Sequence, residues 1–199
     1  MKIFRFFIPI IWVISVAGCF NPFFPEKGNP PQVASSPQRT IQLFREAYER
    51  RDIFAFEDLI YDMEEFSSYT QVSEDYTSTF NKLLWQPKVF IDDIFPQGTS
   101  RFLPRGRSYF ELKWEQEYLI HRKMFEWSDE IVFLPSLVAR ETFFEINGTD
   151  TVSALVKTED SRIRIRYGGQ DFTMNITGQV FAMKRKNGFW KIWKWIELN

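Results

Sequence analysis

Residues 161–173 read SRIRIRYGGQDFT, and this stretch decides the fold class. Before Gly168-Gly169, polar and apolar side chains alternate with a period of two, which is the pattern of a strand with one buried face. Two adjacent glycines form a typical hairpin turn because they adopt positive φ without steric cost. We therefore predict a hairpin that joins strands over 161–167 and 171–184.

Two similar turns lie on either side of this hairpin. Asn147-Gly148 separates apolar-rich runs at 138–146 and 150–157, and Asn187-Gly188 separates 171–184 from 189–198. Because such dipeptides favour tight turns between antiparallel strands, the sequence predicts an antiparallel meander over its C-terminal part.

The segment before the meander carries helical patterns. Ser36-Pro37 combines a hydroxyl N-cap with proline at the first helical position, and it predicts a helix over 37–50. Asp52 is expected to cap a second helix. Apolar residues follow each cap at helical spacing: Ile41, Phe44 and Tyr48 in the first helix, and Phe56, Leu59, Ile60 and Met63 in the second.

The middle of the chain is harder to interpret. A third helix is predicted near 74–85. The prolines and glycines within 86–107 predict that this next segment is irregular. Residues 110–121 alternate with a period of two and predict a strand, although the same residues are compatible with a helix. On such a strand His121 shares the polar side with Glu111, Glu115 and Glu117, so we expect a solvated histidine.

Helices followed by a meander predict an α+β domain, with N-terminal helices packed on a curved antiparallel sheet. Two segments of the domain resemble the nuclear transport factor 2-like (cystatin-like cone) superfamily. The entrance, from Ser36-Pro37 through Arg50-Arg51-Asp52 to Leu59, resembles that family's proline, helix, charged residue–Asp, helix pattern. The C-terminal part of the domain resembles that family's last hairpin, over Lys186-Asn187-Gly188-Phe189-Trp190-Lys191-Ile192.

The resemblance covers about residues 37–199, and 65–107 is longer and less regular than the family pattern. It implies a cone-like sheet, with a conical cavity between sheet and helices. The family includes isomerases, dehydratases, domain-fusion modules and envelope proteins, so the fold does not settle the function.

The N-terminus has the features of an export signal. Lys2 and Arg5 precede an apolar run over 6–17. This run is shorter than the roughly twenty residues that span a bilayer, and it suits a signal peptide. It ends in Val16-Ala17-Gly18-Cys19, which resembles the bacterial lipobox. That resemblance implies cleavage after Gly18 and lipidation of Cys19. The alternative is ordinary secretory cleavage beside a chance cysteine.

The lipobox divides the chain into a signal peptide (1–18), a Pro-rich tether (19–36) and a folded domain (37–199). Two or three acyl chains would hold the protein stably on a membrane of the cell envelope. Because no Asp follows Cys19, the outer membrane is favoured over the inner membrane.

Composition excludes several classes of function. Of 25 basic side chains, Lys2 and Arg5 leave with the leader, so 23 remain against 26 acidic ones, a net charge of −3. This balance argues against nucleic-acid binding. A single cysteine and a single histidine leave no internal disulfide and no cysteine-rich zinc site. We expect no metal and no cofactor.

Two groups of residues are candidate binding elements. With 22 Phe and 7 Trp, the core or a cavity wall should be aromatic, and we expect Trp114, Tyr118 and Trp193 in such a wall. Arg162, Arg164 and Arg166 fall on one face of their strand, about 6.6 Å apart. They could clamp a carboxylate or phosphate, or they could simply protect a sheet edge against pairing.

No catalytic set can be assigned from the sequence. The favoured function is therefore a non-catalytic module that binds an apolar or amphipathic ligand, or an envelope protein partner. The first alternative is a small isomerase- or dehydratase-like cavity enzyme, which requires a carboxylate or His121 inside the cone, next to a tyrosine. The second alternative is a structural surface or assembly protein.

Overall fold

A computed structural model describes residues 34–71, 88–90, 102–103, 106–147 and 150–198. All of them belong to one compact unit, Pro31–Asn199. Its helices are α2 (Pro37–Arg50), α3 (Ile53–Glu57) and α5 (Trp114–Trp127). Its strands are β1 (Ser67–Gln71), β2 (Lys88–Phe90), β3 (Ser108–Lys113), β4 (Glu130–Phe133), β5 (Ala139–Asn147), β6 (Asp150–Thr158), β7 (Ser161–Tyr167), β8 (Gln170–Lys186) and β9 (Phe189–Leu198).

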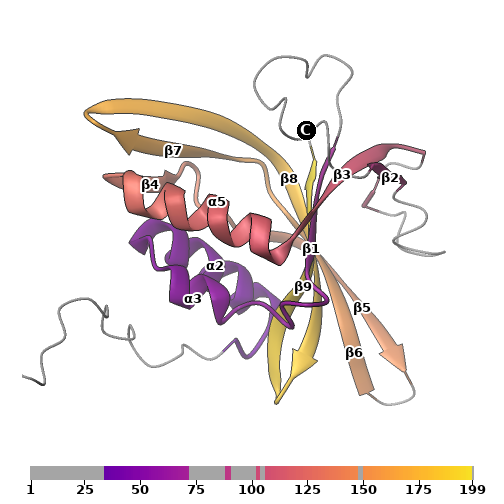
Figure 1. The fold of residues 1–199 in the computed structure, drawn as a ribbon. Coiled ribbons are helices and arrows are strands. Elements are labelled where there is room, and N and C mark those ends of the chain that lie inside the picture. Colours follow the sequence, from indigo (N-terminus) through magenta and orange to yellow (C-terminus); the bar gives the residue numbers. More distant parts are fainter. Residues whose placement is uncertain (1–33, 72–87, 91–101, 104–105, 148–149, 199) are drawn as a thin grey trace, which may run out of the picture. The chain divides into compact units, whose positions relative to one another are not determined.

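The strands form a mixed, mostly antiparallel sheet in the order β2-β3-β1-β9-β8-β6-β5. Among these pairs, β1 and β9 run parallel. The helices pack on one face of the sheet (Figure 1), where Phe44 of α2 contacts Phe181 and Trp195 of the sheet. The other face carries a second cluster around Tyr69, Tyr109 and Ile196. The predicted α+β class is confirmed.

The predicted hairpins are present, but β6 and β7 do not lie side by side as in a simple meander. They follow one another along the same side of β8 in one register, with Lys157 opposite Val180 and Ser161 opposite Ile176. Between these pairs, hydrogen bonds to side chains replace those of the backbone ladder. The Gly178 N–H, for example, donates to Asp160 Oδ1 at 2.9 Å. The far half, β7 with the start of β8, also pairs with β4.

Gly178, which interrupts this ladder, has a φ of +23°, a conformation that L side chains rarely adopt. A Cβ there would lie 3.3 Å from the backbone oxygen of Thr158. We therefore expect Gly178→Ala to lower the free energy of unfolding by about 1–2 kcal/mol. Chemical denaturation measures this, with the exposed neighbour Thr177→Ala as control. Equal effects of the two substitutions would contradict the proposed strain.

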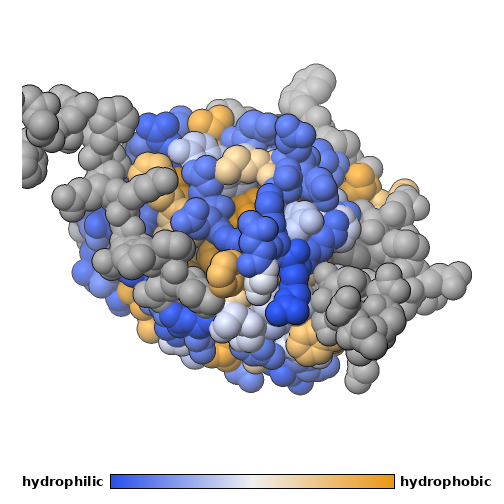
Figure 2. All heavy atoms as spheres, turned by 90° about the horizontal axis from the view of Figure 1, so that it is seen from below, coloured by the Kyte–Doolittle hydropathy of each residue, from blue (hydrophilic) through white to orange (hydrophobic). Residues whose placement is uncertain are grey.

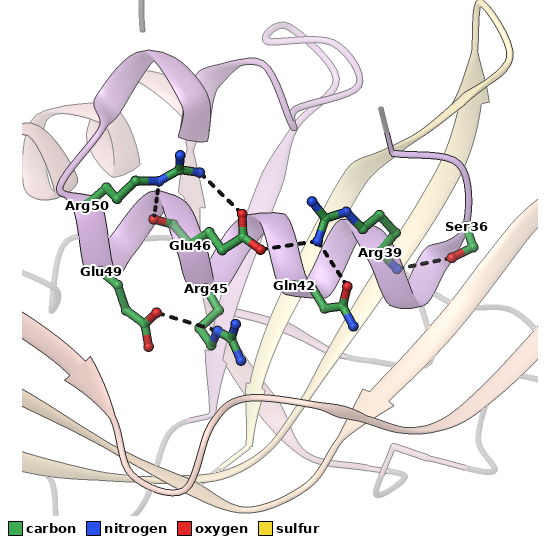
Figure 3. A network of polar contacts seen from close by, with 7 residues as sticks. All are labelled: Ser36, Arg39, Gln42, Arg45, Glu46, Glu49 and Arg50. Carbon is green, nitrogen blue, oxygen red and sulfur yellow. Dashed lines mark hydrogen bonds and ion pairs between the residues drawn. The ribbon is translucent and has the colours of Figure 1, made fainter. Parts of the chain in front are cut away.

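The first predicted helix is confirmed as α2. The Ser36 hydroxyl accepts a hydrogen bond from the Arg39 N–H at 3.1 Å, as expected of an N-cap. The outer face of α2 carries ion pairs (Figure 3), in which Glu46 lies 3.1 Å from Arg39 and 3.3 Å from Arg50. Because this face is polar, the opposite apolar face is the one that packs on the sheet.

The second predicted helix is shorter than expected. Asp52 Oδ1 caps α3 by accepting from the N–H groups of Phe54 and Ala55 at 3.1 and 3.0 Å. The helix ends at Glu57, and Ile60 instead forms an isolated bridge with Ile192 of β9. Met63 is exposed, so the predicted stripe does not extend to it. Tertiary pairing with β9 overrides the helical pattern here.

The strand predicted over 110–121 is half wrong. β3 ends at Lys113, and 114–127 forms the helix α5, which begins with a capping interaction: the Lys113 N–H donates to Gln116 Oε1 at 3.0 Å. The predicted irregular region 86–107 contains the short strand β2. The helix predicted at 74–85 lies outside the described residues. β1 and β4 were not predicted.

Candidate functional site

A chain of polar side chains lies inside the core between the helices and the sheet. Tyr48 comes from the end of α2, Glu117 and His121 from α5, and Ser68 from β1. His121 is 4% exposed and Glu117 is 6% exposed. Because they are four residues apart on a helix, they point to the same side, and this side faces the core. The expected solvated histidine is therefore wrong, and Glu117 is not on a wet face.

The hydrogen bonds among these buried side chains determine which ring nitrogen of His121 carries a proton. Its Nδ1 lies 2.7 Å from the backbone oxygen of Glu117 and 3.1 Å from Glu117 Oε2. Both neighbours are acceptors, so Nδ1 carries a proton. In the neutral ring Nε2 then accepts from the Tyr48 hydroxyl. At the far end the Ser68 hydroxyl donates to Glu117 Oε1.

A second carboxyl group lies close to this chain. Glu197 of β9 accepts a hydrogen bond from Thr70 Oγ1 at 2.9 Å. Burial, assisted by the charge of Glu117, raises the pKa of Glu197 to about 7, against the opposing effects of Thr70 and His121. The group therefore changes protonation near neutral pH.

The same surroundings shift the pKa values of His121 and Tyr48. Burial lowers the pKa of His121, but its hydrogen bond to Glu117 and the Glu117 charge outweigh this, so that the net pKa is raised. Burial and the charges of Glu117 and Glu197 hold the pKa of Tyr48 well above its ordinary value. Tyr48 therefore remains a neutral hydroxyl.

Aromatic rings surround His121. Phe56 stacks on the imidazole with ring centroids 4.6 Å apart, and Tyr48 approaches it edge-on at 5.3 Å. Trp195 and Phe125 lie at 5.8 and 6.1 Å. These rings exclude water, and they strengthen the polar contacts they enclose.

The structure separates the three residues expected in one cavity wall. The rings of Trp114 and Tyr118 lie together at 5.6 Å on α5, at the core that holds His121. Trp193 instead packs against the cluster on the other sheet face, with Lys184 Nζ 3.6 Å from its ring centroid. It occupies a register shift between β8 and β9, where Ile192 and Lys194 pair with consecutive residues of β8.

The arginine column is largely occupied by the protein's own carboxylates. Glu130 Oε2 lies 3.0 Å from Arg164 and 3.7 Å from Arg166, and Asp171 lies 2.9 Å from Arg166. Arg162 is exposed. The edge-protection interpretation is wrong, because β7 pairs with β4 on one side and β8 on the other. These ion pairs compete with an external anion for Arg164 and Arg166.

Sequence reasoning missed Tyr48 and Glu117 as members of a polar site. The available signal was the helical spacing of Trp114, Glu117, His121 and Phe125, which the alternation over 110–121 obscured. The lipobox residues Val16, Ala17, Gly18 and Cys19 lie outside the described residues.

In the part of the chain that the structure describes, no helix is long and apolar enough to cross a membrane. Nor do the described residues place three or more His, Cys, Asp or Glu side chains together as metal ligands.

No protein-family model matches this chain, and no curated protein matches it. Its structural neighbours include an NTF2-like superfamily protein from Salmonella enterica serovar Typhimurium, with 12% identity, coverage of 81% of this chain and 87% of that chain, and a TM-score of 0.48.

Two further neighbours are similar at the same level. A proposed dehydratase of the NTF2-like family from Streptomyces avermitilis has 12% identity, coverage of 80% and 89%, and a TM-score of 0.46. An NTF-2 like protein of unknown function from Shewanella oneidensis has 11% identity, coverage of 81% and 94%, and a TM-score of 0.44. Likeness at this level carries no information about what this chain binds.

Proposed function

We propose that this chain is a lipid-anchored protein of the bacterial cell envelope, and that its NTF2-like domain is a non-catalytic module for a ligand or a protein partner. The observation that carries the anchor is the position of Cys19. It is the single cysteine of the chain, and it directly follows an apolar run that ends in Val16-Ala17-Gly18. A tether over 19–36 then leads to the domain, and the outer membrane is the favoured location.

The surroundings of His121 support a non-catalytic domain. Both ring nitrogens are engaged by Tyr48 and Glu117, and Phe56 stacks on the ring. A general base must reach the proton it removes, but His121 is almost completely buried among the protein's own side chains. The polar chain therefore serves to fix the helices against the sheet.

The anchor is tested by Cys19→Ser. Without the acceptor thiol, incorporation of a labelled fatty acid should fall to background, and the protein should leave the membrane fraction after cell lysis. Asn21→Ser, two residues downstream, serves as the matched control and should keep both label and location. A Cys19→Ser protein that still incorporates label would rule out this anchor.

The binding role is tested by native mass spectrometry of residues 31–199, purified gently without the leader. A reproducible additional mass supports a ligand-binding module, and its identification names the ligand class. A bare mass favours a protein partner or a structural role, which crosslinking in intact cells then separates.

One observation favours a second candidate, a small proton-transfer enzyme of the isomerase or dehydratase kind. That function requires His121 inside the cone next to a tyrosine, and Tyr48 occupies this position. His121 would act as the base and the Tyr48 hydroxyl as a hydrogen-bond donor to a carbonyl oxygen, after the aromatic side chains open. Deuterium exchange next to the carbonyl of cyclic ketones tests it. Exchange by wild type that His121→Gln abolishes supports the enzyme, and an inactive wild type argues against it.

A further inference from the structure

The far half of β8 has an edge that no described strand covers. β7 pairs with residues 170–176 on one side, whereas β9 reaches β8 only as far as Thr177, opposite Leu198. Among the described residues, no strand lies against Asp171–Ile176 on the side away from β7.

The register tells which backbone groups point outward at this edge. Gly168-Gly169 closes a tight turn between Tyr167 and Gln170, and such a closing pair exchanges hydrogen bonds. Pairs alternate from there, so the N–H and C=O groups of Asp171, Thr173 and Asn175 point away from β7.

The hydrogen bonds on the other side of β7 agree with this alternation. Arg162, which lies opposite Asn175, turns its N–H and C=O toward Leu134 at 3.1 and 2.8 Å, away from β8. The N–H and C=O groups of Asn175, its partner on β8, must therefore also point away from β7. The edge thus presents a row of alternating backbone donors and acceptors.

The other described sheet edges are protected, but this one is not. β5 has register shifts near both ends and carries Arg140 and Glu141, while β2 and β4 are short. On the β8 edge the single charge is Asp171, which is paired with Arg166. Phe172 and Met174 on the same stretch are 51% and 54% exposed. Natural proteins rarely leave such an edge bare.

We propose that this edge pairs antiparallel with the same edge of a second copy of the chain, about a two-fold axis at Thr173. In this register Asp171 of each copy lies opposite Asn175 of the other, and Phe172 lies opposite Met174. Apolar side chains meet apolar ones, no like charges face each other, and the outward backbone groups find partners. This complementarity identifies a second copy, rather than another protein, as the occupant.

Sedimentation of residues 31–199, the compact unit with its own core, over the micromolar range tests the proposal. Wild type should form a dimer. Thr173→Lys places two ammonium groups opposite each other and should weaken the dimer about tenfold or more. Thr173→Pro removes an outward N–H that β7 does not use, so it should yield a folded monomer. Ser136→Lys, at an exposed position in a loop, should remain dimeric.

Crosslinking tests the register and the occupant. Residues 31–199 contain no cysteine, so Thr173→Cys introduces one thiol per copy. A short bis-maleimide should link two Thr173→Cys chains but not two Ser136→Cys chains. A wild-type protein that stays monomeric, or a dimer that survives both Thr173→Lys and Thr173→Pro, would overturn the proposal.

Discussion

Glu117→Ala is expected to lower the free energy of unfolding by about 3–5 kcal/mol. Glu117 is buried, and its carboxylate accepts from the Ser68 hydroxyl and lies 3.1 Å from His121 Nδ1. Its removal leaves the buried Ser68 hydroxyl without its acceptor. It also removes the carboxylate that stabilises the charged form of His121, at a site that is enclosed by the core. Urea or guanidinium denaturation with a fluorescence readout measures the change.

Glu115→Ala is the matched control for this substitution. Glu115 lies on the same helix two residues earlier but is exposed, so its removal should change the stability by less than about 0.5 kcal/mol. If Glu117→Ala costs no more than Glu115→Ala, the buried chain does not fix the helices against the sheet, and our account of the site fails.

The second prediction is that the free energy of unfolding decreases as the pH rises from about 5 to about 8. The folded-state pKa of Glu197 is about 7, above its ordinary value of 4.5. Folding therefore favours the protonated form, whose stabilisation is complete below pH 4.5 and is lost as the pH rises through 7. The difference corresponds to about 3–4 kcal/mol at most, since each pKa unit is worth about 1.4 kcal/mol.

His121 acts in the same direction as Glu197. Its pKa is raised in the fold, so its stabilisation is present at low pH and disappears as the pH rises through the folded-state pKa. The carboxyl groups whose pKa is lowered, Asp62, Glu111 and Asp171, act in the opposite direction, but they lose their contribution only at more acidic pH.

Denaturation curves at pH 5, 6, 7 and 8 measure this dependence. Glu197→Gln should flatten the curve, because the amide is neutral throughout and retains an oxygen to accept from Thr70. Glu159→Gln, at an exposed position, should leave the wild-type dependence unchanged. A wild type whose stability is constant or rises from pH 5 to pH 8 would show that Glu197 and His121 do not titrate as described.

The sequence could predict those elements whose stabilising interactions are local. Ser36 and Asp52 cap their helices with their own side chains, and Asn187-Gly188 supplies the positive φ angles of its turn. The hairpin strands follow from alternation combined with tight turns. All of these contacts lie within a few residues along the chain, so residue type alone specifies them.

The candidate site could not be predicted in the same way. The segment 110–121 fits two periods equally well, and the choice between strand and helix depends on the capping at Lys113 and on burial of the face that holds His121. Tyr48 reaches His121 across 73 positions of sequence, and Ser68 reaches Glu117 across 49. No pattern within either segment indicates such a meeting.

By itself, the sequence determined the α+β class, the caps, the hairpin turns and the prediction of a lipid anchor at Cys19, because each depends on neighbours in the chain. Only the tertiary structure decided that β7 continues β6 along β8, that His121 is enclosed by Tyr48 and Glu117, and that no described strand pairs with the far edge of β8. The physical reason is that burial and strand pairing are set by packing between distant segments, and this packing selects one among several locally allowed conformations.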